Sequence, residues 1–322
     1  MKTIKNSLLI AVCVGLFIFS SCKKEETINR YDMVSQYELN KSVVQTNTTN
    51  VATAFQTVFI NMPDSADQAR VAQSFIDEAT YFEDGSGYFF LDTYEGWVVA
   101  HLNHALVGTC RFDTTDIYGK YFVREIIQTV KYSGYGFVEF YRRNIATNVY
   151  ERKLSFVTNL PAASGLLGSG FYGDPEETFY EPLEAKKTVL KECCNTIAKG
   201  LGNLFDEIYT DSLQRLDFMR EFISNVRFFD DRSGYFFIND LTAFCHAHAA
   251  NPANAGVDFS DYQDTKGAYF MLEMVNKVVA DDYGFVEYYW NNPVSGQEEQ
   301  KLTYVVRIPG YDFFVGAGIY VE

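Results

Sequence analysis

The 322-residue sequence is short of proline, tryptophan and histidine, and above all of positive charge. It contains 7 prolines, 2 tryptophans and 4 histidines, and its 42 acidic residues outnumber 27 lysines and arginines. The resulting net charge of −15 repels phosphate backbones and anionic membrane surfaces. Nucleic-acid binding is therefore disfavoured, and no basic membrane-binding face is apparent.

Cysteine is also scarce, because six cysteines in this length do not make a disulfide scaffold. Cys13 lies in an N-terminal apolar run and Cys22 directly after it. Four cysteines remain in the body of the chain: Cys110, Cys193, Cys194 and Cys245. A position in the core is the default interpretation for all four, since the sequence alone assigns no pairs.

Motifs for catalysis and for metal binding are missing as well. There is no Gly-x-Ser-x-Gly elbow, phosphate loop, dinucleotide fingerprint, His-Glu-x-x-His or Cys-x-x-Cys pattern. His246 and His248 form a His-x-His half-site, but a closed zinc site usually needs four ligands. We therefore expect no metal, no cofactor and no catalysis, and a metal-dependent envelope enzyme is the alternative that a metal assay would test.

The first 21 residues have the composition of a bacterial export signal. Two lysines precede an apolar stretch at 8–19, which is shorter than the ~20 residues of a membrane-spanning helix. The Ser-Ser-Cys ending resembles a lipobox, which predicts a signal peptide at 1–21, lipidation of Cys22 and a charged tether at 22–34. The protein, with a net charge of −17 after cleavage, would be lipid-anchored in the cell envelope, on the periplasmic face or the cell surface. A secretory signal with an incidental cysteine is the alternative.

The rest of the chain is an internal duplication. Residues 75–101 match 222–248 at an offset of 147. Residues 116–172 match 264–320 at an offset of 148, with 21 identities in 57 positions. A repeat of this length indicates two copies of one structural unit.

The duplication predicts two units, 35–175 and 176–322, each with its own core. Each unit opens with two helices, and short aromatic and β-branched runs then follow in the order β-β-α-β-β-β. The predicted helices lie at 36–60, 66–82, 118–132, 181–209 and 211–227, and the strands of the first unit at 87–92, 96–101, 136–142, 153–160 and 166–172. Consecutive short strands imply an antiparallel sheet packed against helices, so the predicted fold class is α+β.

The second unit carries a set of motifs in a fixed order. They are Gly234-Tyr235-Phe236-Phe237, Ala247-His248, Asp264-Thr265-Lys266-Gly267, Tyr283 to Tyr288, Lys301-Leu302-Thr303-Tyr304, and Pro309 with Gly316 to Tyr320. Together they resemble Cache domains of the type-2 single-Cache group, and the resemblance covers 70–172 and 217–322. It implies a PAS-like sensor fold outside the cytoplasm, with a small organic acid or similar metabolite as the ligand.

The resemblance also implies where the ligand binds, between the concave face of the sheet and the loops after the first strands. In the second unit it points to Tyr235, Phe237, His246, His248, Asp264, Lys301 and Tyr304; a possible second pocket uses Tyr88, Phe90, His101, Asp116 and Lys153. Lysine, histidine and tyrosine would donate to a carboxylate, and the aromatic rings would form the walls. The alternatives are a solvated Lys301, aromatics that belong to the core, and caps at Asp116 and Asp264.

The two units differ in ways that favour the second as the binding unit. Phe156 stands where the second unit has Tyr304, and the segment 162–165 lacks the aromatics of 310–313. The leading hypothesis is an extracytoplasmic lipoprotein that binds a small molecule. We expect it to have no effector domain, because its last strand ends at Glu322, and to signal through a separate membrane partner. The alternative is a structural or interaction protein of the cell surface that uses the fold as a scaffold.

Overall fold

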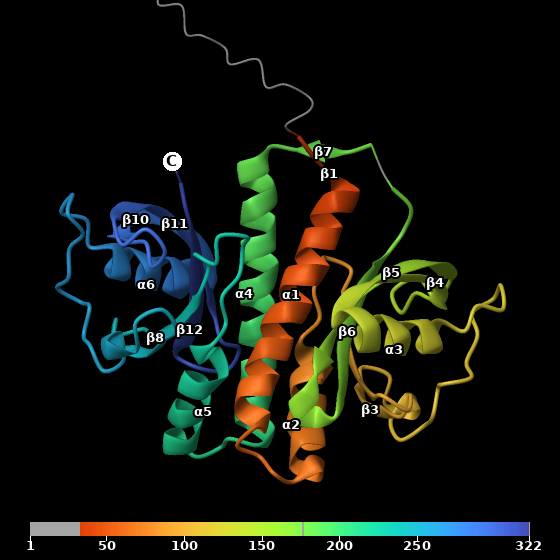
Figure 1. Ribbon diagram of the computed structural model, residues 1–322. Helices are drawn as coiled ribbons and strands as arrows, with labels where there is room; N and C mark the ends of the chain where they lie inside the picture. The colour runs from red at the N-terminus through yellow and green to blue at the C-terminus, as the bar shows by residue number, and fades with distance from the viewer. Residues whose placement is uncertain (1–32, 176, 322) are drawn as a thin grey trace, which may run out of the picture.

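The computed structural model describes residues 33–175 and 177–321, which form two units with the same succession of elements (Figure 1). The first unit consists of α1 (Gln36–Phe59), α2 (Ser65–Glu78), β2 (Phe89–Thr93), β3 (Val98–His101), α3 (Phe122–Ser133), β4 (Tyr135–Arg143), β5 (Tyr150–Leu160) and β6 (Gly165–Tyr172). The second consists of α4 (Pro182–Glu207), α5 (Ser212–Ser224), β8 (Phe236–Asp240), β9 (Cys245–His248), α6 (Phe270–Asp281), β10 (Tyr283–Asn291), β11 (Glu298–Arg307) and β12 (Phe313–Tyr320). A short antiparallel pair, β1 (Val34–Ser35) with β7 (Phe179–Tyr180), precedes α1 and α4.

Each unit contains one five-stranded antiparallel sheet. The strand orders, β3-β2-β6-β5-β4 and β9-β8-β12-β11-β10, are equivalent. A long helix covers one face of each sheet, α1 on β5 and β6 and α4 on β11 and β12. A short helix covers the other face, α3 on β4 and β5 and α6 on β10 and β11. The predicted α+β class and the β-β-α-β-β-β order are confirmed.

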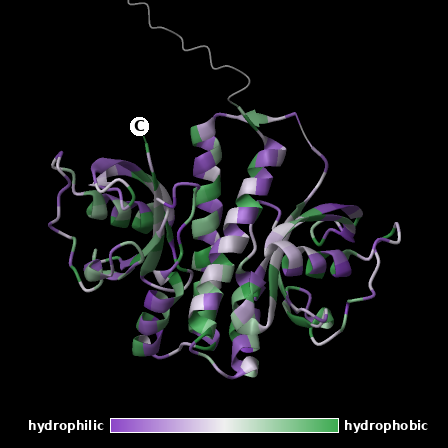
Figure 2. Ribbon diagram, in the orientation of Figure 1, coloured by the Kyte–Doolittle hydropathy of each residue, from purple (hydrophilic) through white to green (hydrophobic). Residues whose placement is uncertain are grey.

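The two long helices lie side by side at the centre of the molecule, with one sheet on either side (Figure 1). Figure 2 shows hydrophobic and hydrophilic residues alternating along both helices, as expected for helices with a buried face. One hydrophobic cluster runs across the contact between the units. In it the ring of Phe222 from α5 lies 5.5 Å from Phe75 and 6.1 Å from Phe55 of the first unit. The expectation that the two cores are independent is therefore wrong, because this cluster joins the units, although a second, smaller cluster lies wholly within the first unit.

The helix predicted at 118–132 begins only at Phe122. The Asp116 carboxylate accepts backbone N–H groups of the segment that follows it and so holds that segment in a tight turn. An equivalent turn built on Asp264 precedes α6. Both turns lie at the outer end of a sheet, next to the pockets described below.

Among the described residues, no helix combines the length and the apolar character that crossing a membrane requires. The predicted signal peptide, the lipidation site at Cys22 and nearly all of the tether fall within 1–32, outside the described residues.

Candidate ligand-binding pockets

The candidate pocket of the second unit lies between its sheet and α6. Alternate residues of a strand share a face, so Tyr235 and Phe237 point the same way and meet His248 of β9 and Lys301 of β11. Phe237 and His248 line a cavity of about 20 Å³, together with Asn239, Cys245, Phe259, Phe270, Met271, Tyr288 and Trp290, and Tyr235 and Lys301 pack behind these two residues. This is space for roughly one water molecule. The structure thus brings together four of the seven residues predicted for this unit.

Lys301 is the unusual group of this pocket. Its side chain is fully buried, and its Nζ lies 3.9 Å from the ring centroid of Tyr235 and 5.1 Å from that of Tyr320. The ammonium has no hydrogen-bond partner in the described part of the chain. Burial lowers the pKa of Lys301 well below its usual value, because a charged amine is costly to desolvate. The solvated lysine that the sequence left open is not what the structure shows.

Glycine on the neighbouring strand makes room for this lysine. A Cβ atom at Gly318 of β12 would lie 2.5 Å from Cε of Lys301, closer than non-bonded atoms approach. In the first unit a Cβ at Gly170 would lie 2.9 Å from Cε of Lys153. The glycines that the sequence shares between the units therefore let each lysine side chain lie across the sheet.

The two histidines of β9 have different surroundings. His248 packs against the ring of Tyr235 with centroids 5.0 Å apart, and burial, followed by the nearby Lys301, lowers its pKa to about 3. His246 instead pairs its Nε2 with Oδ2 of Asp240 at 2.8 Å. Only His248 reaches the pocket. No group of three or more potential metal ligands occurs among the residues that the structure describes.

Tyr304 lies on the opposite face of β11 from Lys301, because residues three apart on a strand point to opposite sides. Its hydroxyl donates to Oδ1 of Asn195 on α4 at 3.3 Å, and its ring packs 4.9 Å from that of Phe285. The structure therefore corrects the expectation that Tyr304 and Lys301 line one pocket. Tyr304 belongs to the core between the sheet and α4.

Asp264 and Asp116 direct their carboxylates to backbone N–H groups rather than to the cavities. One oxygen of Asp264 accepts from Lys266 and Ala268, both at 2.9 Å, and the other accepts from Tyr289 at 3.0 Å. Burial raises the pKa of each carboxyl, but these N–H groups outweigh it and lower the pKa. Both residues hold turns, which is the structural role that the sequence left open.

The first unit has an equivalent pocket. Lys153 is buried with its Nζ 3.7 Å from the ring centroid of Tyr88 and 3.5 Å from the hydroxyl of Tyr172, to which it donates. The cavity of about 10 Å³ is lined by Tyr88, Phe90, His101, Arg111, Phe122, Ile126, Phe140, Arg142 and Lys153. Four of the five residues predicted for this pocket line it, and the fifth is Asp116.

Sequence reasoning missed the residues that distinguish the two pockets. Arg111 and Arg142 line the first cavity, and Phe259 and Trp290 line the second. At the offset of 148, Arg111 aligns with Phe259 and Arg142 with Trp290. The alignment of the repeats could therefore have shown that each cation of the first unit is replaced by an aromatic residue in the second. Isolated β-bridges directly before Arg111 and Phe259 occupy equivalent places in the two units.

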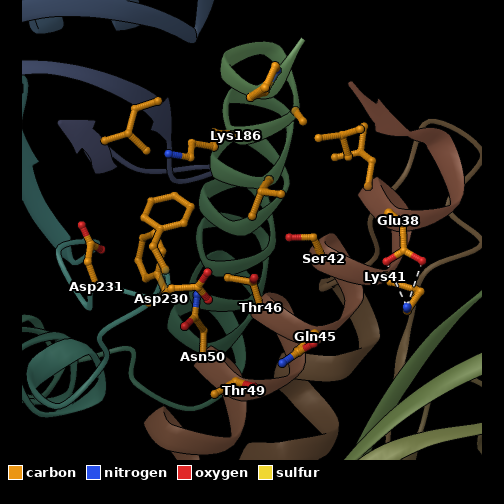
Figure 3. Close-up of a pocket in the computed structure, with 18 of the residues that line it drawn as sticks. Glu38, Lys41, Ser42, Gln45, Thr46, Thr49, Asn50, Lys186, Asp230 and Asp231 are labelled. Carbon is orange, nitrogen blue, oxygen red and sulfur yellow. Dashed lines mark hydrogen bonds and ion pairs between the residues drawn. The ribbon is translucent and has the colours of Figure 1, made fainter. Parts of the chain in front are cut away.

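A much larger hollow, of about 720 Å³, lies between α1, α4 and the segment 228–231 (Figure 3). Its lining mixes polar and apolar side chains, and Glu38 and Lys41 form an ion pair at 3.0 Å on its α1 side. Tyr320 lines this groove and also lies against Lys301. The groove lies along the boundary between the units, and the buried Lys301 lies against the Tyr320 ring.

Family models match both halves of the chain. The model described as Single Cache domain 2 matches residues 34–184, and the model described as Cache domain matches residues 196–322. The chain belongs to the Cache family and carries two Cache domains in tandem. Cache domains are extracytoplasmic sensor domains, so the family indicates the sensing of small molecules outside the cytoplasm.

Two curated relatives are signalling proteins. The methyl-accepting chemotaxis protein McpP of Pseudomonas putida is 33% identical over 92 residues, which are 29% of this chain and 17% of that protein. The sensor histidine kinase MctS of Rhizobium johnstonii is 23% identical over 140 residues, 44% of this chain and 30% of that protein. The chain thus spans less than a third of the length of either relative.

Similar solved structures include a periplasmic sensor domain of a chemotaxis protein, 26% identical with a TM-score of 0.40 over 44% of this chain and 100% of that one. A Cache chemosensory domain, whose title concerns carboxylic acid recognition, is 26% identical with a TM-score of 0.39 over 44% of this chain and 96% of that one.

Proposed function

We propose that this chain is an extracytoplasmic receptor that binds a small organic acid in its second Cache domain, without catalysing a reaction. The observation that carries the proposal is Lys301, whose amine is fully buried and has no partner among the described residues. An unpaired buried ammonium is unfavourable. A carboxylate supplies both the opposite charge and the acceptor oxygens that this group lacks.

The surroundings of Lys301 suit such a ligand. The cavity walls are aromatic and apolar, so they exclude water and strengthen a charge-assisted hydrogen bond. His248 is neutral at physiological pH because its pKa is lowered to about 3, so its ring can hydrogen-bond a ligand without adding charge. The cavity of about 20 Å³ has room for roughly one water molecule, so a bound acid must be compact and the side chains around it must move apart to admit it.

The proposal includes a lipid anchor at Cys22 and a separate membrane signalling partner. The Ser-Ser-Cys ending of the N-terminal apolar run supports the anchor. The similarity to a chemotaxis protein and to a sensor histidine kinase supports a partner of that kind. Replacement of Cys22 by serine should release the protein from the membrane fraction, whereas a variant that still resists carbonate extraction would place the anchor elsewhere.

Ligand binding is tested by a thermal-shift screen and calorimetry on the mature chain with formate, acetate, propionate, lactate and pyruvate. Ligand at ~100 times its dissociation constant stabilises the folded state by about 2.7 kcal/mol, enough to raise the melting temperature by a few degrees. Lys301→Met should remove this shift, and Lys277→Met, which removes an exposed lysine of α6, should keep it. If no metabolite binds, the scaffold function is favoured.

A further inference from the structure

The two pockets keep the same frame and differ in charge. Each has a buried lysine, a histidine and two tyrosines at aligned positions. Around this frame, Asp92, Arg111 and Arg142 of the first unit stand where the second has Asn239, Phe259 and Trp290. The difference between the units is therefore concentrated in the charged groups next to the lysine.

Of the three cations that line the first cavity, two have no counter-ion among the residues that the structure describes. Arg111 is neutralised, since its Nη2 donates to both oxygens of Asp92 at 3.0 and 2.7 Å, with both side chains at least nine-tenths buried. Arg142 has no hydrogen bond or ion pair within the described residues, and its guanidinium lies 5.8 Å from the ring centroid of Phe122. Lys153 has no carboxylate partner there either. The pocket thus holds two uncompensated positive groups.

The positive charges of the first pocket act on the same two groups, His101 and Lys153. Burial, together with the charges of Arg111, Lys153 and Arg142, lowers the pKa of His101 to about 3. Burial also lowers the pKa of Lys153, and the two arginines add to that effect while Tyr88 opposes it. Like charges held this close in an apolar setting repel one another, and an anion placed between them relieves the repulsion.

The second pocket has no such surplus. None of the side chains that line its cavity is charged, and Lys301 lies behind Tyr235. The position of Arg142 is taken by Trp290, whose ring centroid lies 6.1 Å from Phe259 and 5.4 Å from Phe270. One amine in an aromatic cage can compensate a single negative charge, while a second charge would be desolvated without a partner.

We propose that the two Cache domains bind anions of different charge. The first takes a compact dianion held by Lys153 and Arg142, and the second takes a monoanion held by Lys301, with an apolar end against Trp290 and Phe259. This rests on the anion-binding function proposed above and adds the ligand class of each pocket. Cavities of about 10 and 20 Å³ have room for no more than about one water molecule each, so side chains must move for either anion to bind, and Arg142 of the first pocket is partly exposed.

Calorimetry on the full mature chain tests the inference, with malonate and phosphate as dianion probes and acetate and propionate as monoanion probes. Lys301→Met should lose the monoanions and keep the dianions, and Lys153→Met should do the reverse. Arg142→Trp, which introduces the residue of the second unit, should weaken dianion binding at least tenfold and leave propionate binding unchanged. Arg142→Gln replaces it if the tryptophan variant does not fold. Arg143→Gln, at the exposed neighbouring position, is the matched control.

Binding of malonate, of phosphate or of both at the first unit supports the inference and identifies the type of dianion. Dianion binding that is lost in Lys301→Met, or that is unaffected by both changes at Arg142, overturns it, as does equal binding of both charge classes by one pocket. In those cases an anion still binds, so the receptor function stands. If the wild-type chain binds no anion at all, the receptor function itself fails.

Discussion

The amine of Lys301 lies 3.9 Å from the ring centroid of Tyr235 and has no hydrogen-bond partner among the described residues, although it is fully buried. The corresponding Lys153 lies 3.7 Å from Tyr88 but also donates to the hydroxyl of Tyr172. The attraction between a cation and an aromatic face offsets only part of the free energy that the cation loses when it leaves water. Without a ligand, the lysine of the second pocket therefore has fewer hydrogen bonds than the lysine of the first.

Lys301→Met should make the empty protein more stable while it removes ligand binding. Methionine has a similar shape and no polar group to desolvate, so we expect the free energy of unfolding to rise by about 1–3 kcal/mol. Lys153→Met should give a smaller gain, because Lys153 already has a hydroxyl partner. Urea unfolding without added anions measures both. A loss of stability in Lys301→Met would mean that the amine makes contacts that the structure does not show.

Anion binding to the second unit should take up a proton. Burial lowers the pKa of Lys301 well below its usual value, and a bound carboxylate raises it again by stabilising the charged form. At a pH between the free and the bound pKa, binding draws up to about one proton from the buffer. Calorimetry at pH 8 and 9 in buffers of different ionisation enthalpy measures this uptake. Buffer-independent heats, or proton release, would contradict it.

Acid should destabilise the folded chain through His101 and His248. The pKa of each is lowered to about 3, against about 6.5 in the unfolded chain. Between these values the unfolded chain binds protons that the folded chain does not. The contribution of the two histidines to the free energy of unfolding is therefore fully present above pH ~6.5. It falls as the pH drops toward 3, by up to ~1.4 kcal/mol per pH unit for each histidine.

This pH dependence is measured by urea unfolding between pH 7.5 and 4.5. His248→Gln and His101→Gln should each reduce the slope by about one proton relative to the wild type. The difference between variant and wild type at pH 7.5 gives the packing cost of each change separately. Slopes that match the wild type in both variants would show that these histidines are protonated in the folded chain.

Cleavage of the chain between the units should leave them associated. Residues 174, 175 and 177–179, which connect the units, are exposed, whereas α1 and α4 pack through one hydrophobic cluster. A protease site inserted after Asp174 should therefore give two fragments on a denaturing gel that elute together from a sizing column in native buffer. Separate elution of two folded fragments would show that the shared cluster contributes little.

The fold class could be predicted from the sequence, because it depends on local patterns. These are the alternation of residues within short strands and the offsets of 147 and 148 between the two copies of the repeat. The hydrophobic cluster that joins the units could not be predicted in this way. Phe75 and Phe222 lie on helix faces that could pack on their own unit or on the other, and local periodicity does not distinguish these partners.

Some features of the site could likewise be predicted from the sequence and others could not. The opposite orientation of Lys301 and Tyr304 follows from strand alternation and could have been predicted. The exchange of Arg142 for Trp290 could have been found in the repeat alignment. The partnerless state of Lys301 could not, since it depends on Gly318 and Tyr320, which another strand brings into register with it.

The hydrophobic cluster that spans α1 and α4 would link the unfolding of the two units, and this has a consequence for a chain that binds two solutes at once. Each ligand bound to its own unit adds its term, RT ln(1 + [L]/Kd), to one common unfolding equilibrium. Each ligand would thus multiply the ratio of folded to unfolded chains by its own factor, 1 + [L]/Kd. If each Cache domain binds its proposed ligand, the folded chain would be most stable when both solutes are present.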